Sequence, residues 1–409
     1  MKKRIGIWNK NFFLLWQGQM VSVFGDALYT IALDFFVLEV TGSTAIMGTV
    51  MALVTMFRII FGPISGVIVD RFNRKILIVL ADVIRGLGIL FIALAAKQGF
   101  LEIWMIMVGA IVLGICSSFF NPAIESVLPD IVPAENMIRA SSIYQIAVTG
   151  MDVLGQSVGG ALYAVLGAPI IFLINGISYL VSAATEGFIA IPKVESKNIS
   201  VTFIEDFKDG LRFVFKNEGL VRTIIMSFFI NFLFGMIRVL LIPWFLGNSQ
   251  LGMTKYGILN AVSSVGLMVG MLVLSLCTIK SQHKYRIYIA SILLFIVSIG
   301  VGAFFNQYVL ILIFFFMAFG FQFVFNTVLN STIMLKTPAD KRGKVSAMKT
   351  TLGMAVSPLG NFVGGVLCEF IDARKLIICN TFVAVIVVAI VVINPAVKAF
   401  LNNDNQICE

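Results

Sequence analysis

The stretch GPISGVIVDRFNRK at residues 62–75 decides the fold. An apolar segment with two glycines runs into Asp70, and the basic residues Arg71, Arg74 and Lys75 follow within five positions. Glycine lets helices approach one another closely in lipid, and basic residues beside a membrane helix mark its cytoplasmic end. The stretch is therefore predicted to be the cytoplasmic end of a membrane-spanning helix and the loop that follows it.

The composition of the whole chain agrees with this prediction. The 409 residues are 59% hydrophobic and only 12% charged, with a mean hydropathy of +0.99. Ordinary globular domains are about 45–50% apolar and about 25% charged. Because so few polar side chains cannot cover a soluble surface, a soluble enzyme, a disordered protein and a DNA-binding protein are all disfavoured.

Apolar stretches long enough to cross a bilayer recur along the chain. A membrane helix needs about 20 mostly apolar residues. Twelve stretches qualify, at about 12–38, 44–69, 76–97, 102–126, 137–166, 168–191, 221–247, 254–279, 287–305, 308–334, 344–370 and 374–397. We expect an all-α membrane protein with twelve transmembrane helices and both termini on one side.

The basic residues predict which side that is. With the N-terminus inside, 22 of the 30 lysines and arginines fall in inside segments and 4 in outside loops. Cytoplasmic loops collect lysine and arginine, so both termini are predicted to be cytoplasmic. The net charge of +9 is then a consequence of topology, and we expect no nucleic-acid partner.

The two halves of the chain resemble each other at a shift of 205 residues. The matches without a gap include Pro133 with Pro338, Leu154-Gly155 with Leu359-Gly360, Val158-Gly159-Gly160 with Val363-Gly364-Gly365, and Asn175 with Asn380. Such repeats are typical of secondary transporters whose site lies between the halves. We expect six-helix bundles at 1–191 and 221–398, and a cytoplasmic tail at 399–409. The linker at 192–220 is predicted to hold an amphipathic helix on the inner membrane surface, with a solvated connector as the alternative.

The loop after the second span resembles a known family. Gly66, Asp70, Arg71, Arg74 and Lys75 are similar to the signature between spans 2 and 3 of the major facilitator superfamily, although Asn73 stands where that signature often has glycine. The resemblance implies the major facilitator fold. It also implies that these residues form a charge-linked latch on the cytoplasmic side, in which Asp70 and Arg74 take part.

A second resemblance lies in the fifth span. Gly155, Gly159 and Gly160 are similar to the antiporter motif of the drug-exporting members, with Gln156 where the family has proline. Gly360, Gly364 and Gly365 repeat the pattern in the eleventh span. Small residues at this spacing also serve helix packing alone, so both interpretations stand.

Further stretches resemble the drug and siderophore exporter branch that includes macrolide-efflux proteins. They are Leu15-Trp16 with Gly18-Gln19, Gly25-Asp26, Thr41-Gly42-Ser43, Arg58, Asp82 with Arg85, Asn121-Pro122-Ala123, and Leu128-Pro129-Asp130. The resemblance covers most of the chain and is denser in its first half.

Ionisable residues inside spans need a partner or a function, because a charge at the bilayer centre costs about 2.5–3.5 kcal/mol even on lenient scales. Asp34, Asp152 and Asp26 are the candidate proton carriers, in that order, with Asp26 also expected to pair with Arg58. Asp82 and Arg85, three residues apart, are predicted to form a structural ion pair.

The family resemblance also suggests which residues face a substrate cavity. In the major facilitator fold, spans 1, 4, 7 and 10 line the cavity, with spans 2, 5, 8 and 11 beside them. Arg58, Asn231 and Arg238 are then candidate cavity residues. Gln322, Asn326 and Asn330 recur every four residues on one face of the tenth span, which favours a water-filled cavity over lipid.

These observations predict a monomeric, multi-pass transporter of the bacterial cytoplasmic membrane. We expect it to export amphipathic small molecules, such as a macrolide or a siderophore, in exchange for protons, surrounded by membrane lipid. A lysophospholipid flippase of the same fold is the alternative. A membrane enzyme or sensor is disfavoured, because His283 is the only histidine and no catalytic set accompanies it. No cofactor or metal is expected.

Overall fold

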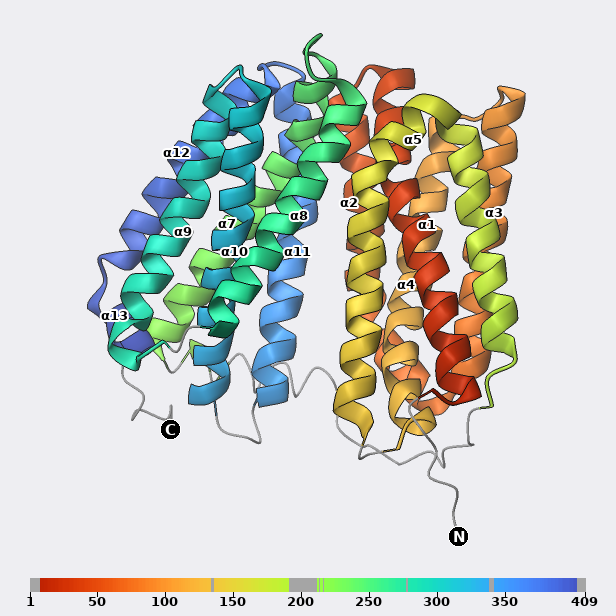
Figure 1. The fold of residues 1–409 in the computed structure, drawn as a ribbon, viewed down its shortest axis with the longest axis horizontal. Coiled ribbons are helices and arrows are strands. Elements are labelled where there is room, and N and C mark those ends of the chain that lie inside the picture. The colour runs from red at the N-terminus through yellow and green to blue at the C-terminus, as the bar shows by residue number, and fades with distance from the viewer. Residues whose placement is uncertain are drawn as a thin grey trace. The chain divides into compact units, whose positions relative to one another are not determined.

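The computed structural model is all-helical and describes residues 8–133, 136–190, 212, 214–215, 217–276, 279–337 and 342–402. Its helices in the first half are α1 (Lys10–Thr41), α2 (Thr44–Arg71), α3 (Arg74–Gln98), α4 (Ile103–Ile131) and α5 (Met137–Gly187) (Figure 1). The second half holds α7 (Glu218–Leu246), α8 (Gly252–Leu276), α9 (Ser281–Phe304), α10 (Tyr308–Lys336), α11 (Arg342–Cys368), α12 (Ala373–Val392) and α13 (Pro395–Asn402). The predicted all-α class is confirmed.

Short polar residues begin the helices where the apolar stretches begin. The side chains of Asn9, Ser43 and Asn73 accept hydrogen bonds from backbone N–H groups in the first turns of α1, α2 and α3. Such N-caps satisfy donors that have no partner within the helix. At the other end, Gly42 terminates α1 in the left-handed conformation that glycine adopts without strain.

Helix α5 contains two helical segments. It is 51 residues long, and Gly167 interrupts it with φ 72° and ψ 168°, directly before Ala168-Pro169. Glycine tolerates this backbone conformation, and the following proline cannot supply a helical N–H. The interruption falls between the predicted fifth and sixth spans, 137–166 and 168–191.

Within the described residues, ten helical segments are long and apolar enough to cross a membrane. One of them is the 49-residue segment Arg139–Gly187. In α11, the segment Ala355–Cys368 is an apolar helix shorter than these ten. The N-terminal part of α11 is less apolar because it carries Arg342, Lys344 and Lys349. The count of twelve spans, the orientation and the pairing into bundles stay predictions.

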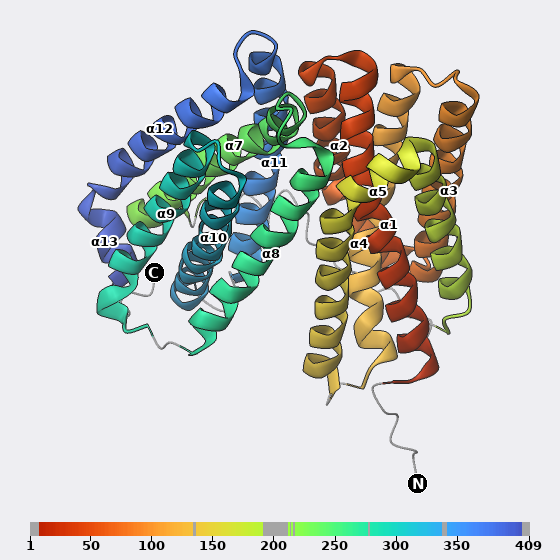
Figure 2. The same ribbon diagram turned by 45° about the horizontal axis from the view of Figure 1, so that its top comes forward.

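The chain divides into two compact units, Met1–Ile199 with Met253–Ile258, and Ser200–Gly252 with Leu259–Glu409. In unit 1, α1 and α3 pack against α5, and α2 and α3 pack against α4 (Figures 1 and 2). In unit 2, α7 packs against α11 and α12, and α9 packs against α10 and α12. The predicted linker at 192–220 lies largely outside the described residues.

The end of the described chain differs from the predicted boundary. The twelfth predicted span, 374–397, is divided into α12 and α13, and the predicted tail at 399–409 begins inside α13. Val397, Phe400 and Leu401 of α13 are buried against α7 and α9. Because Phe400 and Leu401 lie three and four positions after Val397, the three residues form one apolar face, and this face packs the short helix onto unit 2.

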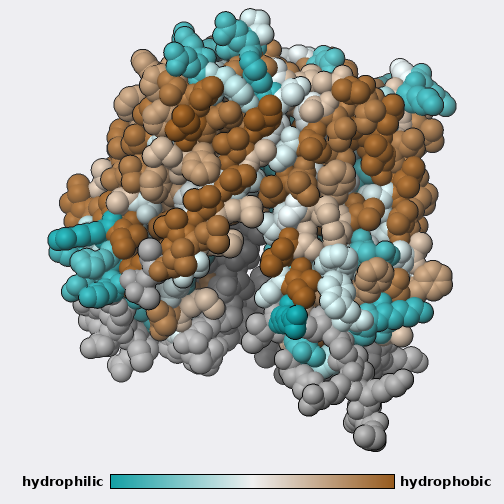
Figure 3. Space-filling view, in the orientation of Figure 1, coloured by the Kyte–Doolittle hydropathy of each residue, from teal (hydrophilic) through white to brown (hydrophobic). Residues whose placement is uncertain are grey.

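The surface of the helices is apolar along their sides. On the face in Figure 3, hydrophobic residues cover the helix sides, and hydrophilic residues gather toward the helix ends. Many large apolar side chains are exposed, including Leu272 at 61%, Phe382 at 67% and Leu276 at 85%. Exposed apolar area of this extent fits a lipid environment and not water.

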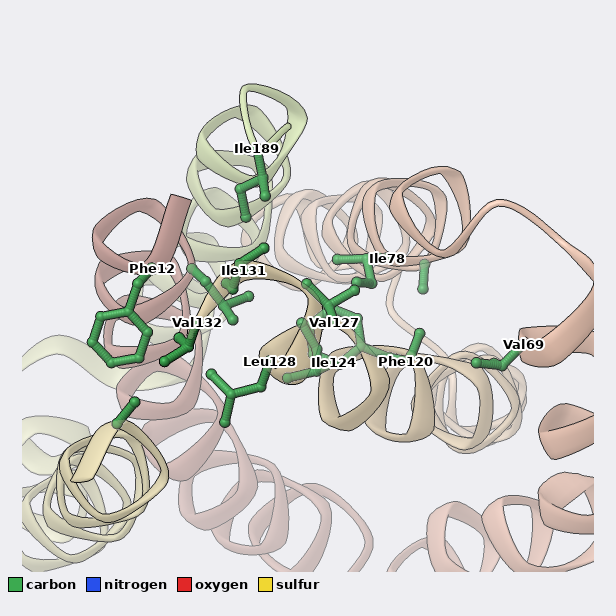
Figure 4. Packing of buried hydrophobic residues seen from close by; sticks show 14 of the residues in the cluster. Phe12, Val69, Ile78, Phe120, Ile124, Val127, Leu128, Ile131, Val132 and Ile189 are labelled. Atoms are coloured by element: carbon green, nitrogen blue, oxygen red, sulfur yellow. The ribbon is translucent and has the colours of Figure 1, made fainter. Parts of the chain in front are cut away.

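A hydrophobic cluster holds one end of unit 1 together. Ile124, Val127 and Leu128 on the C-terminal part of α4 lie among side chains from α1 and α3, including Phe12 and Ile78 (Figure 4). These residues are buried at 8% exposure or less. The cluster fixes the end of α4 beside the start of α3, where the charged loop begins.

Candidate functional site

Asp26 on α1 is bonded to two residues of α5. Its Oδ1 accepts a hydrogen bond from the Tyr179 hydroxyl and another from Asn175 Nδ2 at 3.3 Å. Two donors satisfy a carboxylate that is partly buried in the helix packing. The predicted pairing of Asp26 with Arg58 stays a prediction.

Arg85 on α3 is the buried cation next to this carboxylate. It is 4% exposed, forms an ion pair with Asp82, and its guanidinium lies 4.0 Å from the ring centre of Phe120 and 4.4 Å from that of Tyr179. The predicted Asp82–Arg85 pair is confirmed. Aromatic faces on two sides further stabilise a guanidinium that has left water.

Glu186 on α5 extends the polar residues to the end of the bundle where α1 begins. It is 1% exposed, and its Oε1 accepts a hydrogen bond of 2.9 Å from Gln19 Nε2 on α1. The Tyr144 hydroxyl donates to Gln19 Oε1 at 3.2 Å. We call Gln19, Asp26, Asp82, Arg85, Tyr144, Asn175, Tyr179, Ser182 and Glu186 the buried polar network of unit 1.

Helical spacing and two glycines bring these residues together. Tyr179, Ser182 and Glu186 are three and four positions apart, so they share one face of α5. A Cβ atom on Gly25 of α1 would lie 2.4 Å from Ser178 Oγ, and one on Gly18 would lie 2.9 Å from Thr185 Oγ1. The absence of side chains at Gly18 and Gly25 therefore lets α1 lie directly against this face.

The remaining proton-carrier candidates lie on the same helices. Asp34 is buried on α1 at 6% exposure. Tyr29, which lies between Asp26 and Asp34 in the sequence, has a buried hydroxyl that interacts electrostatically with both carboxyl groups. Asp152 is half-buried on α5 and accepts a hydrogen bond of 2.9 Å from Gln156 Nε2. Gln156, the residue that departs from the family motif, thus holds one of the candidate carboxylates. Arg58 is half-buried on α2.

Arg74, the first residue of α3, forms an ion pair with α4. Arg74 Nη1 lies 2.6 Å from Asp130 Oδ2 and also donates to the Ser126 carbonyl at 3.2 Å. The two side chains are 17% and 22% exposed. Lys75 is half-buried, with its backbone N–H bonded to Asn73. The side chains of the remaining motif residues, Gly66, Asp70 and Arg71, lie outside the described part of the structure.

The two glycine motifs make equivalent helix contacts. A Cβ on Gly155 would lie 2.9 Å from the Phe24 carbonyl oxygen on α1, and a Cβ on Gly159 would lie 3.3 Å from Ile31. In unit 2, a Cβ on Gly360 would lie 2.1 Å from the Phe232 carbonyl oxygen on α7, and one on Gly364 would lie 2.9 Å from Met236 Cα. Gly160 and Gly365 are buried as well.

The cavity candidates of unit 2 lie on exposed helix faces. Asn231 and Arg238, seven residues apart on α7, are exposed. On α10, Asn326 and Asn330 are exposed and Gln322 is half-buried. Polar and charged side chains in the middle of apolar helices are expensive to hold in lipid, so these faces are suited to contact water or cargo.

Sequence reasoning missed several residues of the buried polar network. Asn175 was visible only as the match to Asn380, and Tyr179 and Gln19 carry no charge that would mark them in an apolar span. Asp130 lies in a stretch that resembles the exporter branch, but only the fold places it beside Arg74. Tertiary packing is needed to identify all four.

Comparisons with known proteins agree with this architecture. The model of the Major Facilitator Superfamily matches residues 15–361. Macrolide efflux protein A of Streptococcus pyogenes is 25% identical over 271 residues, covering 64% of this chain and 67% of that protein. The uncharacterized MFS-type transporter YfiS of Bacillus subtilis is 25% identical over 395 residues, 92% of this chain and 91% of its own. Among solved structures, a bacterial homologue of the human lysosomal transporter Spinster, inward-facing and unoccupied, superposes with a TM-score of 0.71 at 14% identity, covering 96% of this chain and 97% of the other.

Proposed function

The chain belongs to the major facilitator superfamily and is a membrane transporter, and from this premise we propose that it exports amphipathic small molecules in exchange for protons. The similarity to macrolide efflux protein A is the observation that supports export as the direction of transport and amphipathic small molecules as the class of cargo. A macrolide or a siderophore is the expected cargo. Transport proceeds by alternating access of the two halves in the cytoplasmic membrane, with both termini inside.

The placement of carboxylates supports the coupling to protons. Asp34, Asp152 and Asp26 lie on α1 and α5, buried or half-buried, where the aqueous environment that favours ionisation is largely absent. Asp34 is the first candidate, followed by Asp152. Asp26 ranks third because Tyr179 and Asn175 already hold it in place.

The cargo interacts with the exposed polar faces of unit 2 in this proposal. Arg238 and Asn231 on α7 and Asn326 and Asn330 on α10 offer hydrogen bonds beside apolar and aromatic side chains. An amphipathic molecule needs both kinds of contact. Arg58 on α2 is the matching candidate of unit 1.

Reconstitution into proteoliposomes with an imposed pH gradient tests the proposal. A cargo panel should contain a macrolide, a siderophore and a lysophospholipid, with empty liposomes as the control. Gradient-driven movement of the macrolide or siderophore supports proton-coupled export. Movement of the lysophospholipid alone, without dependence on the gradient, would replace the proposal with a flippase.

A further inference from the structure

The buried polar network of unit 1 holds more acidic groups than its cation can neutralise. Arg85 is its one positive charge, and it interacts electrostatically with Asp82, Glu186 and Asp26. Asp82 is 0% exposed and Glu186 is 1% exposed. Buried charges without compensation are strongly unfavourable, so the three carboxyl groups cannot all be ionised together.

The hydrogen bonds distinguish the three carboxyl groups. Asp26 accepts from Tyr179 and Asn175, and Asp82 pairs with Arg85, so both have the partners of an ionised group. The well-formed hydrogen bond to Glu186 comes from a neutral donor, the amide of Gln19. Glu186 is therefore the carboxyl group least prepared to carry a negative charge.

Three buried oxygens in this region lack a hydrogen bond. They are Glu186 Oε2, Asp82 Oδ2 and Ser182 Oγ. Ser182 lies one helical turn before Glu186 on α5, and its side chain interacts with both carboxyl groups without a well-formed hydrogen bond to either. Buried polar atoms without partners are uncommon, and each one calls for an explanation.

We propose that Glu186 binds a proton, which it shares through the Ser182 hydroxyl with Asp82. A protonated Glu186 donates its O–H to Ser182 Oγ, and the Ser182 O–H donates to Asp82 Oδ2. One proton thus gives all three oxygens a partner and reduces the excess negative charge by one. No bond other than the O–H bond forms, and the proton comes from water.

Every neighbouring element is consistent with a single neutral acid at this position. The groups that face Glu186 or its partners are Gln19 of α1, Asp82 and Arg85 of α3, Tyr144 and Ser182 of α5, and Cys116 of α4. Two further carboxyl groups interact electrostatically with members of this set: Asp26 with Arg85, and Glu125 of α4 with Tyr144. Arg85 is the only cation among them, and its charge is already balanced by Asp82 and Asp26. No second positive charge in the described part of unit 1 lies among these groups to stabilise an ionised Glu186.

The proton site also controls a helix contact. Gln19 bonds to Glu186, and the adjacent Gly18 lets α1 approach Ser182 and Thr185. Loss of the proton leaves a buried negative charge at this contact, which favours separation of α1 from the end of α5 and entry of water. This part of the inference rests on the proposed function: in a proton-coupled exporter, such a contact would open when the proton leaves.

Infrared spectroscopy of the purified full-length protein in lipid nanodiscs tests proton binding without any transport. At neutral pH, the wild type should show the C=O stretch of a protonated carboxyl group, and the band should disappear as the pH is raised. Glu186→Gln should remove the part of this band that Glu186 contributes, as measured by the difference from the wild type, and leave the helical signal unchanged. Glu102→Gln, at an exposed carboxylate outside the network, is the matched control and should keep the band.

Ser182→Ala provides the second test. Removing the hydroxyl takes away the acceptor for the Glu186 proton, so the band should remain at acidic pH but shift to the position of a carboxyl group without a hydrogen bond. A merely structural role of Ser182 would leave the band in place. A wild type without a pH-sensitive carboxyl band, or a band that is unchanged in Glu186→Gln, would overturn the inference. Failure of cargo transport would overturn the proposed function and leave this spectroscopic result untouched.

Discussion

The two halves of the chain share a helical plan but differ in where their charges lie. In the first half, α1, α3 and α5 contain Asp26, Asp34, Asp82, Asp152 and Glu186, and Arg85 is buried among them. The second half has no aspartate or glutamate between Glu218 and Asp340, and Glu369 and Asp372 come only after α11. Among the described residues of unit 2, Lys336 is the buried side chain that carries a charge.

A pair of equivalent residues shows the difference at one position. Asn175 and Asn380 occupy the same place in the 205-residue repeat, and both donate a hydrogen bond to the first helix of their unit. Asn175 donates to the Asp26 carboxylate, whereas Asn380 donates to the Leu233 backbone carbonyl at 2.9 Å. The duplicated packing is retained, but only the first half adds a charge to it. This difference supports the proposal that proton binding takes place in the first half and that most of the cargo contacts lie in the second.

The largest effect is expected at the buried cation of unit 1. Arg85→Met leaves Asp82 buried without its partner, which should lower the free energy of unfolding by about 3–5 kcal/mol. The double variant Asp82→Asn with Arg85→Met should lose less than the single variant, because no charge is left uncompensated. Thermal unfolding in detergent measures both. Equal losses in the two variants would mean that the ion pair is not the relevant interaction.

A second prediction concerns the glycine contacts, in which the halves should behave alike. Gly155→Ala and Gly360→Ala place a methyl group against a backbone carbonyl on α1 and α7, so each should cost about 1–3 kcal/mol of stability. Gly150→Ala on α5 is the control, because open space surrounds that position and alanine favours a helix. Unfolding temperatures compare the three. A neutral Gly360→Ala would show that only the first half depends on this close packing.

Replacing the two equivalent asparagines should lower the free energy of unfolding by different amounts. Asn175→Ala removes a hydrogen bond to a charged group, typically worth about 1.5–3 kcal/mol, whereas Asn380→Ala removes one to a neutral carbonyl, worth about 0.5–1.5 kcal/mol. The Leu233 carbonyl can still serve its own helix after the change. Measured unfolding free energies in which Asn380→Ala is the more damaging variant would contradict the assignment of charge to the first half.

The smallest effect on stability is expected in the loop after α2. Arg74→Ala removes a partly exposed ion pair and should cost about 1 kcal/mol or less. Exchange of the two charges, Arg74→Asp with Asp130→Arg, should restore part of the transport lost in either single variant. Arg286, an exposed residue in the second turn of α9, is the control from the second half and should change neither property when replaced by alanine. A charge exchange that restores nothing would remove the pair from the transport cycle.

Sequence reasoning found the helices because the length of an apolar stretch is a local property. The end of the second helix within 62–75, the break near Gly167 and the Asp82–Arg85 pair could all be predicted, because each depends on residues within a few positions. The number of spans is harder to derive, since the 49-residue segment Arg139–Gly187 counts as one helix although Gly167 interrupts it.

The buried polar network shows what the sequence could not predict. Gln19 and Glu186 are 167 positions apart, and no periodic pattern connects an amide on α1 with a carboxyl group on α5. The expected pairing of Asp26 with Arg58 stays a prediction, and the hydrogen bonds to Asp26 from Tyr179 and Asn175 were not predicted. Neutral donors in apolar helices leave no mark in composition or charge, so only the packing of α1 against α5 brings them to a carboxylate.

The most direct measurement of the central claim is cargo transport driven by a pH gradient in proteoliposomes, with one set of variants in each half. The double variant Asp34→Asn with Asp152→Asn should abolish gradient-driven accumulation of a macrolide while exchange of the cargo without a gradient continues. Arg238→Gln in the second half should raise the cargo concentration needed for half-maximal transport and keep the dependence on the gradient. If the double variant concentrates the macrolide as well as the wild type does, proton coupling does not reside in the first half as proposed, and the account is wrong.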